Sequence, residues 1–314
     1  MRVPQTKLWT AGPASDHDGG LTSDGELIRE FLIADVFTDT PLEGNQLGIF
    51  PDGRGLSDEM MLKATREMNF SETVFFLPPD NPGAPGGVGA DARVRIFTPG
   101  GEIPFAGHPT LGSAWVLGEI CRKQTVTLQT GAGLVPVELE REGEAIAFGW
   151  MSQPVPAWGP YDRAAELLEA LGTRGKPDGL PVEWYRNGPL NAYVEIPGED
   201  ALNALQPDMQ RLARLPVNVS CFTQTPDGYA TRMFAPALGV TEDPATGSAA
   251  GPLAVHLARH GRIRFGDEIK IRQGACVHRP SVLYARAEGT ENTVERVLVG
   301  GRAVVVARGE YRLA

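Results

Sequence analysis

Cysteine is scarce in this 314-residue sequence, and long apolar runs are absent. The three cysteines, Cys121, Cys221 and Cys276, are far apart and in no CxxC or Cys/His spacing, which argues against a disulfide framework and against a zinc site. No stretch approaches the roughly 20 apolar residues that a membrane span needs. The polar residues 1–29 lack the apolar centre of a signal peptide. We therefore expect a cytoplasmic protein that neither crosses a membrane nor holds a metal ion.

Basic residues are also in deficit. Lys and Arg number 29 against 39 Asp and Glu. The resulting net charge of −10 provides no excess of positive charge to attract nucleic acid or an anionic membrane. The GxxxxGK[ST] and GxSxG motifs are absent, and the glycine-rich residues 86–89 follow no predicted strand and open no helix. The sequence therefore implies no nucleotide and no other cofactor.

The order of the predicted elements in the first half indicates a mixed α+β fold. A β-rich run at 31–37 opens the folded part, and a helix is predicted over 56–68 with Ser57 as its N-cap. Residues 108–120 are apolar or small on almost every face, which predicts a helix buried all round. Strands are predicted at 73–77, 93–97, 125–128, 134–139 and 145–149. Residues 152–161 have the composition of a linker and mark the expected domain boundary.

The second half repeats this order. A short helix is predicted at 208–215, strands at 217–223 and 229–234, a helix rich in small residues at 246–260, and four further strands between 269 and 308. Three sequence blocks recur in the same order: 60–71 parallels 209–220, 95–99 parallels 232–236, and 108–114 parallels 243–249. The alternative is two unrelated domains with coincidental spacing of glycine and proline.

The repeat predicts an α+β fold of two pseudosymmetric lobes. Each lobe would be a curved, mostly antiparallel β-sheet or barrel wrapped around one central helix. The expected divisions are an N-terminal arm at 1–29, an N-terminal lobe at 30–152 and a C-terminal lobe at 153–314, with the C-terminal strand able to return to the first lobe.

The starts of the two buried helices carry the most motif-like segments. A helix N-terminus has free backbone N–H groups and the positive end of the helix dipole, which together attract an anion. Because proline is tolerated in the first turn, Pro252 places the second start near Gly247 and Ser248. Gly107 and Gly247 would let the backbone approach a ligand closely, and Ser248 either caps its helix or holds a substrate carboxylate. Two such starts facing one cleft predict a site for a small carboxylate.

Glu72 enters an otherwise apolar strand, and its repeat partner is Cys221, so the acid belongs to one half only. We interpret Glu72 as a partly buried carboxyl with a raised pKa, suited to proton transfer; the alternative is an exposed position at a strand edge. His108 and Asp243 are repeat partners at the helix entrances and further acid/base candidates, against the alternatives of helix caps or, for His108, a hydrogen bond in the core. Asn45 is either a substrate-binding residue or a turn residue.

Two features carry weaker signals. His256 and His260 are four residues apart on a predicted helix, but the sequence offers no adjacent Glu and no third ligand, so we expect surface histidines rather than a zinc pair. The loop rich in glycine and proline at 78–90 is expected to be mobile and is a candidate lid.

In combination, several of these segments resemble the PhzF family of phenazine-biosynthesis-like isomerases. The matching segments are 35–37 (DVF), 44–45 (GN), 69–75 (NFSETVF), 95–99 (RIFTP), 107–110 (GHPT), 242–248 (EDPATGS) and 299–305 (VGGRAVV). The resemblance covers roughly residues 31 to 309. It departs from the family at Gln46, where proline is usual, and in the N-terminal arm.

The resemblance implies the two-lobed fold shared with diaminopimelate epimerase and proline racemase. Those relatives use paired cysteines at the helix entrances, where this chain has no thiol, so a two-thiol racemase mechanism is disfavoured. By resemblance, Glu72 is the general acid/base that moves a proton within the substrate, without a cofactor. His108, Asp243 and Ser248 would surround that substrate, and the amides of Gly107 and Gly247 would help to bind it.

The best-known family member isomerises trans-2,3-dihydro-3-hydroxyanthranilate, and the family also implies a homodimer. Two alternatives remain open from the residues. One is an epimerase or racemase of a small carboxylic or amino acid, with Glu72 opposed by either His108 or Asp243 as the second base. The other is a non-catalytic protein that binds a small carboxylate.

Overall fold

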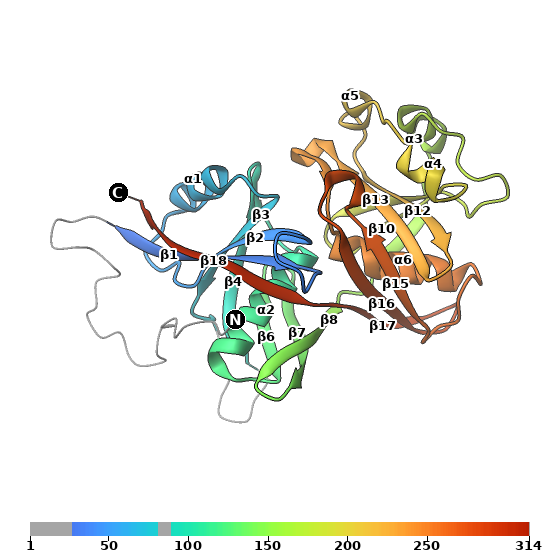
Figure 1. The fold of residues 1–314 in the computed structure, drawn as a ribbon. Helices are drawn as coiled ribbons and strands as arrows, with labels where there is room; N and C mark the ends of the chain where they lie inside the picture. The colour runs from blue at the N-terminus through green and yellow to red at the C-terminus, as the bar shows by residue number, and fades with distance from the viewer. Residues whose placement is uncertain (1–26, 81–88, 314) are drawn as a thin grey trace.

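A computed structural model describes residues 27–80 and 89–313 and contains 18 β-strands and six α-helices in these ranges (Figure 1). The predicted N-terminal arm, apart from its last residues, and most of the 78–90 loop lie outside the described residues. No helix in the described part has the length and apolarity that a bilayer crossing requires.

The first repeat is built from eight strands and two helices. Its strands are β1 (Ile28–Val36), β2 (Asn45–Phe50), β3 (Glu72–Leu77), β4 (Ala92–Thr98), β5 (Gly101–Ile103), β6 (Thr125–Thr130), β7 (Gly133–Glu142) and β8 (Ala145–Gln153). Its helices are α1 (Asp58–Met68) and α2 (Gly107–Cys121). β2 pairs with β3, and β4 with β6, in parallel, whereas the other pairs within the repeat are antiparallel.

The second repeat follows the same plan with additional small helices. Its strands are β10 (Glu183–Arg186), β11 (Leu190–Glu195), β12 (Asn218–Thr225), β13 (Gly228–Ala235), β14 (Val240–Asp243), β15 (Glu268–Gln273), β16 (Ser281–Gly289) and β17 (Val294–Gly301). Its helices are α3 (Ala164–Leu171), α4 (Glu199–Asn203), α5 (Met209–Leu212) and α6 (Gly247–Arg259), with 3-10 turns η1 (Pro236–Leu238) and η2 (Ala275–Val277). The parallel pairs are β11–β12 and β13–β15, at the positions equivalent to those of the first repeat. The predicted order of elements in the internal repeat is therefore confirmed by the pairing order. Two of its residue alignments are wrong, because the strand registers place Asn218 rather than Cys221 at the position of Glu72. Both central helices also begin at a glycine, Gly107 or Gly247, which makes Ser248 rather than Asp243 the counterpart of His108.

Each repeat takes its outermost strand from a segment that follows the other repeat. β9 (Ala157–Pro160) comes directly after β8 and pairs with β10 of the second repeat. β18 (Ala303–Arg312) comes after β17 and pairs along its length with β1 of the first repeat. The red β18 and the blue β1 lie side by side in Figure 1. The two repeats are also joined directly by the antiparallel pair β8–β17.

The hydrophobic core surrounds α2 and α6. Residues 107–118 of α2 and 247–258 of α6 are all buried, as the near-absence of polar residues predicts. α2 packs against β1, β2, β6, β7 and β8, and α6 packs against β15, β16 and β17. By contrast, α1 and α3–α5 lie on the outside of the sheets (Figure 1). The predicted fold class, two pseudosymmetric α+β lobes with a central helix each, is confirmed.

Three local expectations differ from the structure. β1 starts at Ile28, so the last two residues of the predicted arm belong to the sheet. The expected linker at 152–161 contains the end of β8 and all of β9. Its prolines leave enough backbone N–H and C=O groups free for β9 to pair with β10. α6 begins at Gly247 as predicted, but Pro252 lies in its second turn rather than its first.

The proline in α6 is accommodated by a side chain. Pro252 has no N–H to donate to the carbonyl of Ser248, four residues earlier. Asn187 Nδ2 donates to that carbonyl instead, at 3.1 Å. Asn187, the residue after β10, thus replaces the missing backbone hydrogen bond and connects this turn of α6 to the end of that strand.

Candidate functional site

The starts of β2 and β3 bring Asn45 and Glu72 together. α1 ends at Met68, and Asn69 in the left-handed conformation (φ 54°) turns the chain into β3. Glu72, the first residue of β3, pairs in parallel register with Leu47, two residues after Asn45. As a result, Ser71 Oγ donates to Asn45 Oδ1 at 3.2 Å.

The N-termini of α2 and α6 meet backbone to backbone. A Cβ added to Gly107 would lie 2.5 Å from Ser248 N and 2.7 Å from Gly247 Cα, and one added to Gly247 would lie 2.9 Å from the Phe37 ring. The sequence predicts that these glycines allow close approach to a ligand. The close approach seen here is between the two helices themselves, which places both helix starts at one point between the repeats.

Asn45 links the acid/base candidates of both repeats. Its Nδ2 lies 2.8 Å from Asp243 Oδ1, 2.9 Å from the Ala245 carbonyl and 3.2 Å from His108 Nδ1. His108 is in the first turn of α2, and Asp243 ends β14 just before α6. The structure therefore brings together residues that are almost 200 positions apart in the sequence.

Glu72 and His108 face each other with unsatisfied polar atoms. Glu72 Oε2 and His108 Nε2 are 3.6 Å apart, and the two side chains are 16% and 4% exposed. Neither atom has a hydrogen-bond partner among the described residues. Buried polar atoms without partners are rare and call for an explanation. Two of them converging beside a pair of helix N-termini are suited to binding polar groups of a substrate.

Burial changes the protonation of all three candidates. Burial and, to a lesser extent, the negative charge of Asp243 raise the pKa of Glu72 to about 8. Burial also raises the pKa of Asp243 to about 6, against the opposing hydrogen bonds from Thr246 and Asn45. For His108, burial lowers the pKa to about 3, so the ring is neutral. At neutral pH the site therefore holds an ionised Asp243 next to a largely protonated Glu72.

Residues that the sequence did not single out hold Asp243 in place. Thr246 Oγ1 donates to Asp243 Oδ2 at 2.5 Å, and Gln273 Nε2 donates both to the Asp243 carbonyl and to Thr246 Oγ1. Thr246 is the N-cap residue of α6, so neither Asp243 nor Ser248 caps this helix. Thr246 and Ser71 lie inside motifs that the sequence does display, whereas Gln273 reaches the site from β15 and carries no sequence signal.

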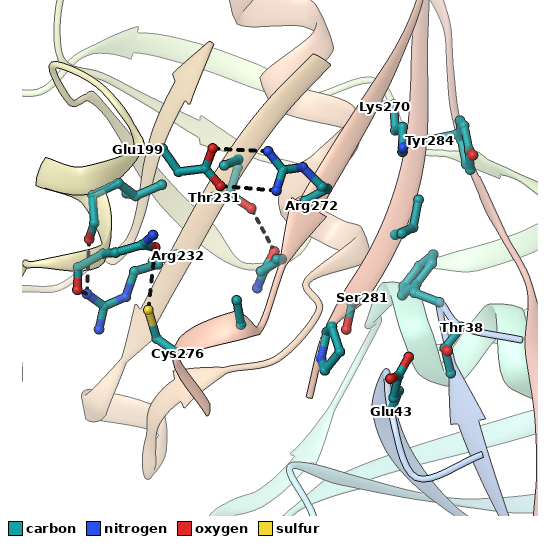
Figure 2. A pocket seen from close by; sticks show the side chains of 18 of the residues that line it. Thr38, Glu43, Glu199, Thr231, Arg232, Lys270, Arg272, Cys276, Ser281 and Tyr284 are labelled. Carbon is teal, nitrogen blue, oxygen red and sulfur yellow. Dashed lines mark hydrogen bonds and ion pairs between the residues drawn. The ribbon is translucent and has the colours of Figure 1, made fainter. Parts of the chain in front are cut away.

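A cavity of about 430 Å³, drawn in Figure 2, shares Gln273 with this cluster but is lined by none of Asn45, Glu72, His108 and Asp243. It is lined mainly by β13, β15 and β16, with Thr38 and Glu43 from the β1–β2 loop across from them. The four cations in its wall are each paired with an acid: Arg232 with Glu242, Lys270 with Asp227, Arg272 with Glu199, and Arg302 with Asp39. With its charges already neutralised, this cavity is a poorer match to a carboxylate than the cluster around Glu72.

The predicted surface position of His256 is wrong. His256 is fully buried, and Glu183 on β10 lies within hydrogen-bond distance of both histidines, at 3.3 Å from His256 and 3.1 Å from His260. No third ligand is visible in the sequence around the two histidines, because Glu183 is more than 70 residues away. Arg259 Nη1, only 2.7 Å from the same Glu183 oxygen, already supplies the positive charge that a metal ion would bring. The cluster is therefore a buried ion-pair network that anchors the C-terminal end of α6.

Comparisons with known proteins show the family and the fold of this chain. The family model described as phenazine biosynthesis-like protein, PhzC-PhzF, matches residues 34–309. A Pseudomonas aeruginosa protein named trans-2,3-dihydro-3-hydroxyanthranilate isomerase is 46% identical over 287 residues, covering 91% of this chain and 100% of the relative.

Solved structures share the fold. A Bacillus anthracis phenazine biosynthesis protein of the PhzF family superposes with a TM-score of 0.79 at 24% identity, covering 90% of this chain and 99% of the other. A hydroxyproline epimerase from Agrobacterium vitis superposes with a TM-score of 0.60 at 13% identity, covering 90% and 91%. The second likeness supports the diaminopimelate epimerase-like and proline racemase-like fold.

Proposed function

Because the chain belongs to the phenazine biosynthesis-like PhzC-PhzF family, we propose that it is an isomerase that shifts a double bond in trans-2,3-dihydro-3-hydroxyanthranilate or a closely related cyclic amino carboxylate. The 46% identity to a protein with that isomerase name, over nearly the whole of both chains, supports the substrate class. The observation that carries the chemistry is the buried, unpartnered pair of Glu72 Oε2 and His108 Nε2.

In the proposed reaction, Glu72 acts as both base and acid. Its carboxylate takes a proton from one carbon of the substrate, and the electrons of that C–H bond shift the double bond. The resulting carboxylic acid exchanges its proton with solvent and delivers one proton to another carbon, so that the substrate loses and gains one hydrogen and Glu72 ends in its starting form. A raised pKa makes Glu72 a stronger base than an ordinary glutamate, which favours removal of a proton from carbon.

His108, Asp243 and Ser248 are assigned supporting roles in this proposal. The neutral His108 ring can donate a hydrogen bond to an oxygen on which negative charge develops, and Asp243 keeps the pKa of Glu72 high. The substrate carboxylate would be bound by the Gly107 amide in the first turn of α2, and by Ser248 and the Gly247 amide in the first turn of α6.

NMR in D₂O tests this proposal. The protein is incubated with trans-2,3-dihydro-3-hydroxyanthranilate and, separately, with other unsaturated and amino carboxylates. We expect conversion with deuterium entering one carbon, and a loss of about 10²–10⁴-fold in turnover for Glu72→Gln. Glu140→Gln, an exposed glutamate on β7, is the matched control and should keep full activity.

The outcomes separate the alternatives. Full turnover by Glu72→Gln would remove Glu72 from the chemistry. Deuterium at an inverted centre without a shifted double bond would instead indicate an epimerase. Thermal stabilisation by a carboxylate that exchanges no proton would indicate a binding protein.

We also propose that the protein is a cytoplasmic homodimer. The family resemblance supports the dimer, and the three cysteines, all unpaired in the structure, fit a reducing compartment. Light scattering during size-exclusion chromatography should give twice the mass of the chain, and the mass of one chain would contradict the dimer.

A further inference from the structure

We propose that Asn45 is a positioning residue, which determines which ring nitrogen of His108 carries the proton. It also holds the His108 ring and Asp243 together across the two repeats. The catalytic consequence rests on the proposed function, whereas the position of the proton can be measured without any substrate.

The orientation of the Asn45 amide follows from its neighbours. On one side lie two acceptors, Asp243 Oδ1 at 2.8 Å and the Ala245 carbonyl at 2.9 Å. If the amide were turned over, its own oxygen would face both of them without a hydrogen atom in between. The Ser71 hydroxyl on the other side donates to Oδ1, which is consistent with the same orientation. The –NH₂ group therefore faces the acceptors.

The same –NH₂ group determines the His108 tautomer. His108 Nδ1 lies 3.2 Å from Asn45 Nδ2. The Asn45 –NH₂ group has two hydrogens for three acceptors, so one hydrogen is shared between two of them. Because an amide nitrogen does not accept hydrogen bonds, the ring nitrogen that faces it presents a lone pair. A neutral imidazole carries one proton, which must then be on Nε2. That nitrogen is the one that faces Glu72 Oε2, so the N–H needed to hold a developing oxyanion points to the proposed reaction centre.

Asn45 is not available to a substrate in this arrangement. Its side chain is buried, with the residue 2% exposed, and both of its polar atoms bond to protein groups. These partners lie just before β3, in the first turn of α2 and just before α6. The Asn45 side chain can therefore make all of its contacts only when the two repeats are correctly aligned. This assignment replaces the substrate-binding role that the sequence suggested for Asn45 with a role in positioning.

The experiment begins with the tautomer. The chain has only five histidines, so labelling them with ¹⁵N and recording two-bond ¹H–¹⁵N correlation spectra resolves each ring, and a His108→Asn variant assigns the signals of His108. We expect the Nε2–H form of His108 in the wild type and a mixture of forms, or the Nδ1–H form, in Asn45→Ala. Thr246→Val is the matched comparison, because it removes the other donor to Asp243 and leaves the contact between Asn45 and His108 in place. It should keep the Nε2–H form.

Kinetics then separate positioning from substrate binding. For Asn45→Ala we expect kcat to fall about 10²-fold with little change in KM, since small displacements of reacting groups have effects of this size. The Nδ1–H form in the wild type, with the Gln46 backbone as its acceptor, would overturn the proposal even if the alanine variant failed to fold. A raised KM with unchanged kcat would also overturn it. If Glu72→Gln keeps its turnover, the proposed role of Glu72 fails while the tautomer result stands by itself.

Discussion

Replacing Glu72 with glutamine should make the protein more stable at alkaline pH, in addition to removing its activity. Glutamine is close in shape to a protonated glutamate, so below the ordinary glutamate pKa of 4.5 the two proteins should be equally stable. As the pH rises from 4.5, the unfolded wild-type chain releases its Glu72 proton while the folded protein retains it up to about pH 8. The wild type therefore loses stability relative to the variant over this interval.

The size of the effect follows from the same interval. At 1.36 kcal/mol per pH unit, the interval between 4.5 and about 8 sets an upper bound of about 5 kcal/mol for the gain in the free energy of unfolding. Urea unfolding at pH 4.5, 6.5 and 8.5 measures it, with Glu140→Gln as the control that should show no trend. Equal stability of Glu72→Gln and wild type at pH 8.5 would refute the claim that this carboxyl is held protonated by its burial.

Three further predictions concern separate features. The wild-type kcat/KM should rise by up to tenfold per pH unit below pH 8 and level off above it, because the ionised Glu72 is the working base; a fall over this range in a pH–rate profile would assign the first step to the protonated form. Gly107→Ala should lower the free energy of unfolding in urea by about 1–3 kcal/mol or more, because the added Cβ would lie 2.5 Å from the backbone of α6. A variant as stable as the wild type would show that the two helix starts can separate freely. Glu183→Gln should cost about 3–5 kcal/mol, because it leaves the Arg259 charge next to a buried histidine without its partner, whereas a gain in stability on calorimetry would indicate that the network serves another purpose.

The sequence is most informative where its patterns depend on neighbouring residues. The small and apolar residues of α2 predict a buried helix, and Ser57 followed by two acids predicts the start of α1; both are confirmed. The recurring blocks are also local patterns, and the order of their strands and helices agrees with the observed pairing. Such features follow from backbone and burial preferences within a dozen residues.

The rest depends on contacts between distant segments. Gln273 reaches Asp243 only because β15 pairs in parallel with β13, and nothing around Gln273 indicates that pairing. In the same way, His256 looks like a surface histidine until β10 places Glu183 against it. The sequence does not predict the strand β9, because Gly159, Pro160 and the two prolines before the strand are typical of linkers. Pairing with a single neighbour needs only some of the backbone groups of β9.

The exchange of outer strands bears on how this site could arise. Each sheet is completed by a strand that follows the other repeat, β9 on β10 and β18 on β1. A half-length protein with the same pairing could complete its sheet only by lending that strand to a second copy. In such an assembly both halves would carry identical residues at the helix entrances and at the start of the third strand. Joining the halves in one chain removes this constraint, so that Glu72, His108 and Asp243 can meet at one site while the residues at their equivalent positions are Asn218, Ser248 and Ile103. Unlike residues at the two equivalent positions of this site are thus available to a fused chain and not to two identical copies.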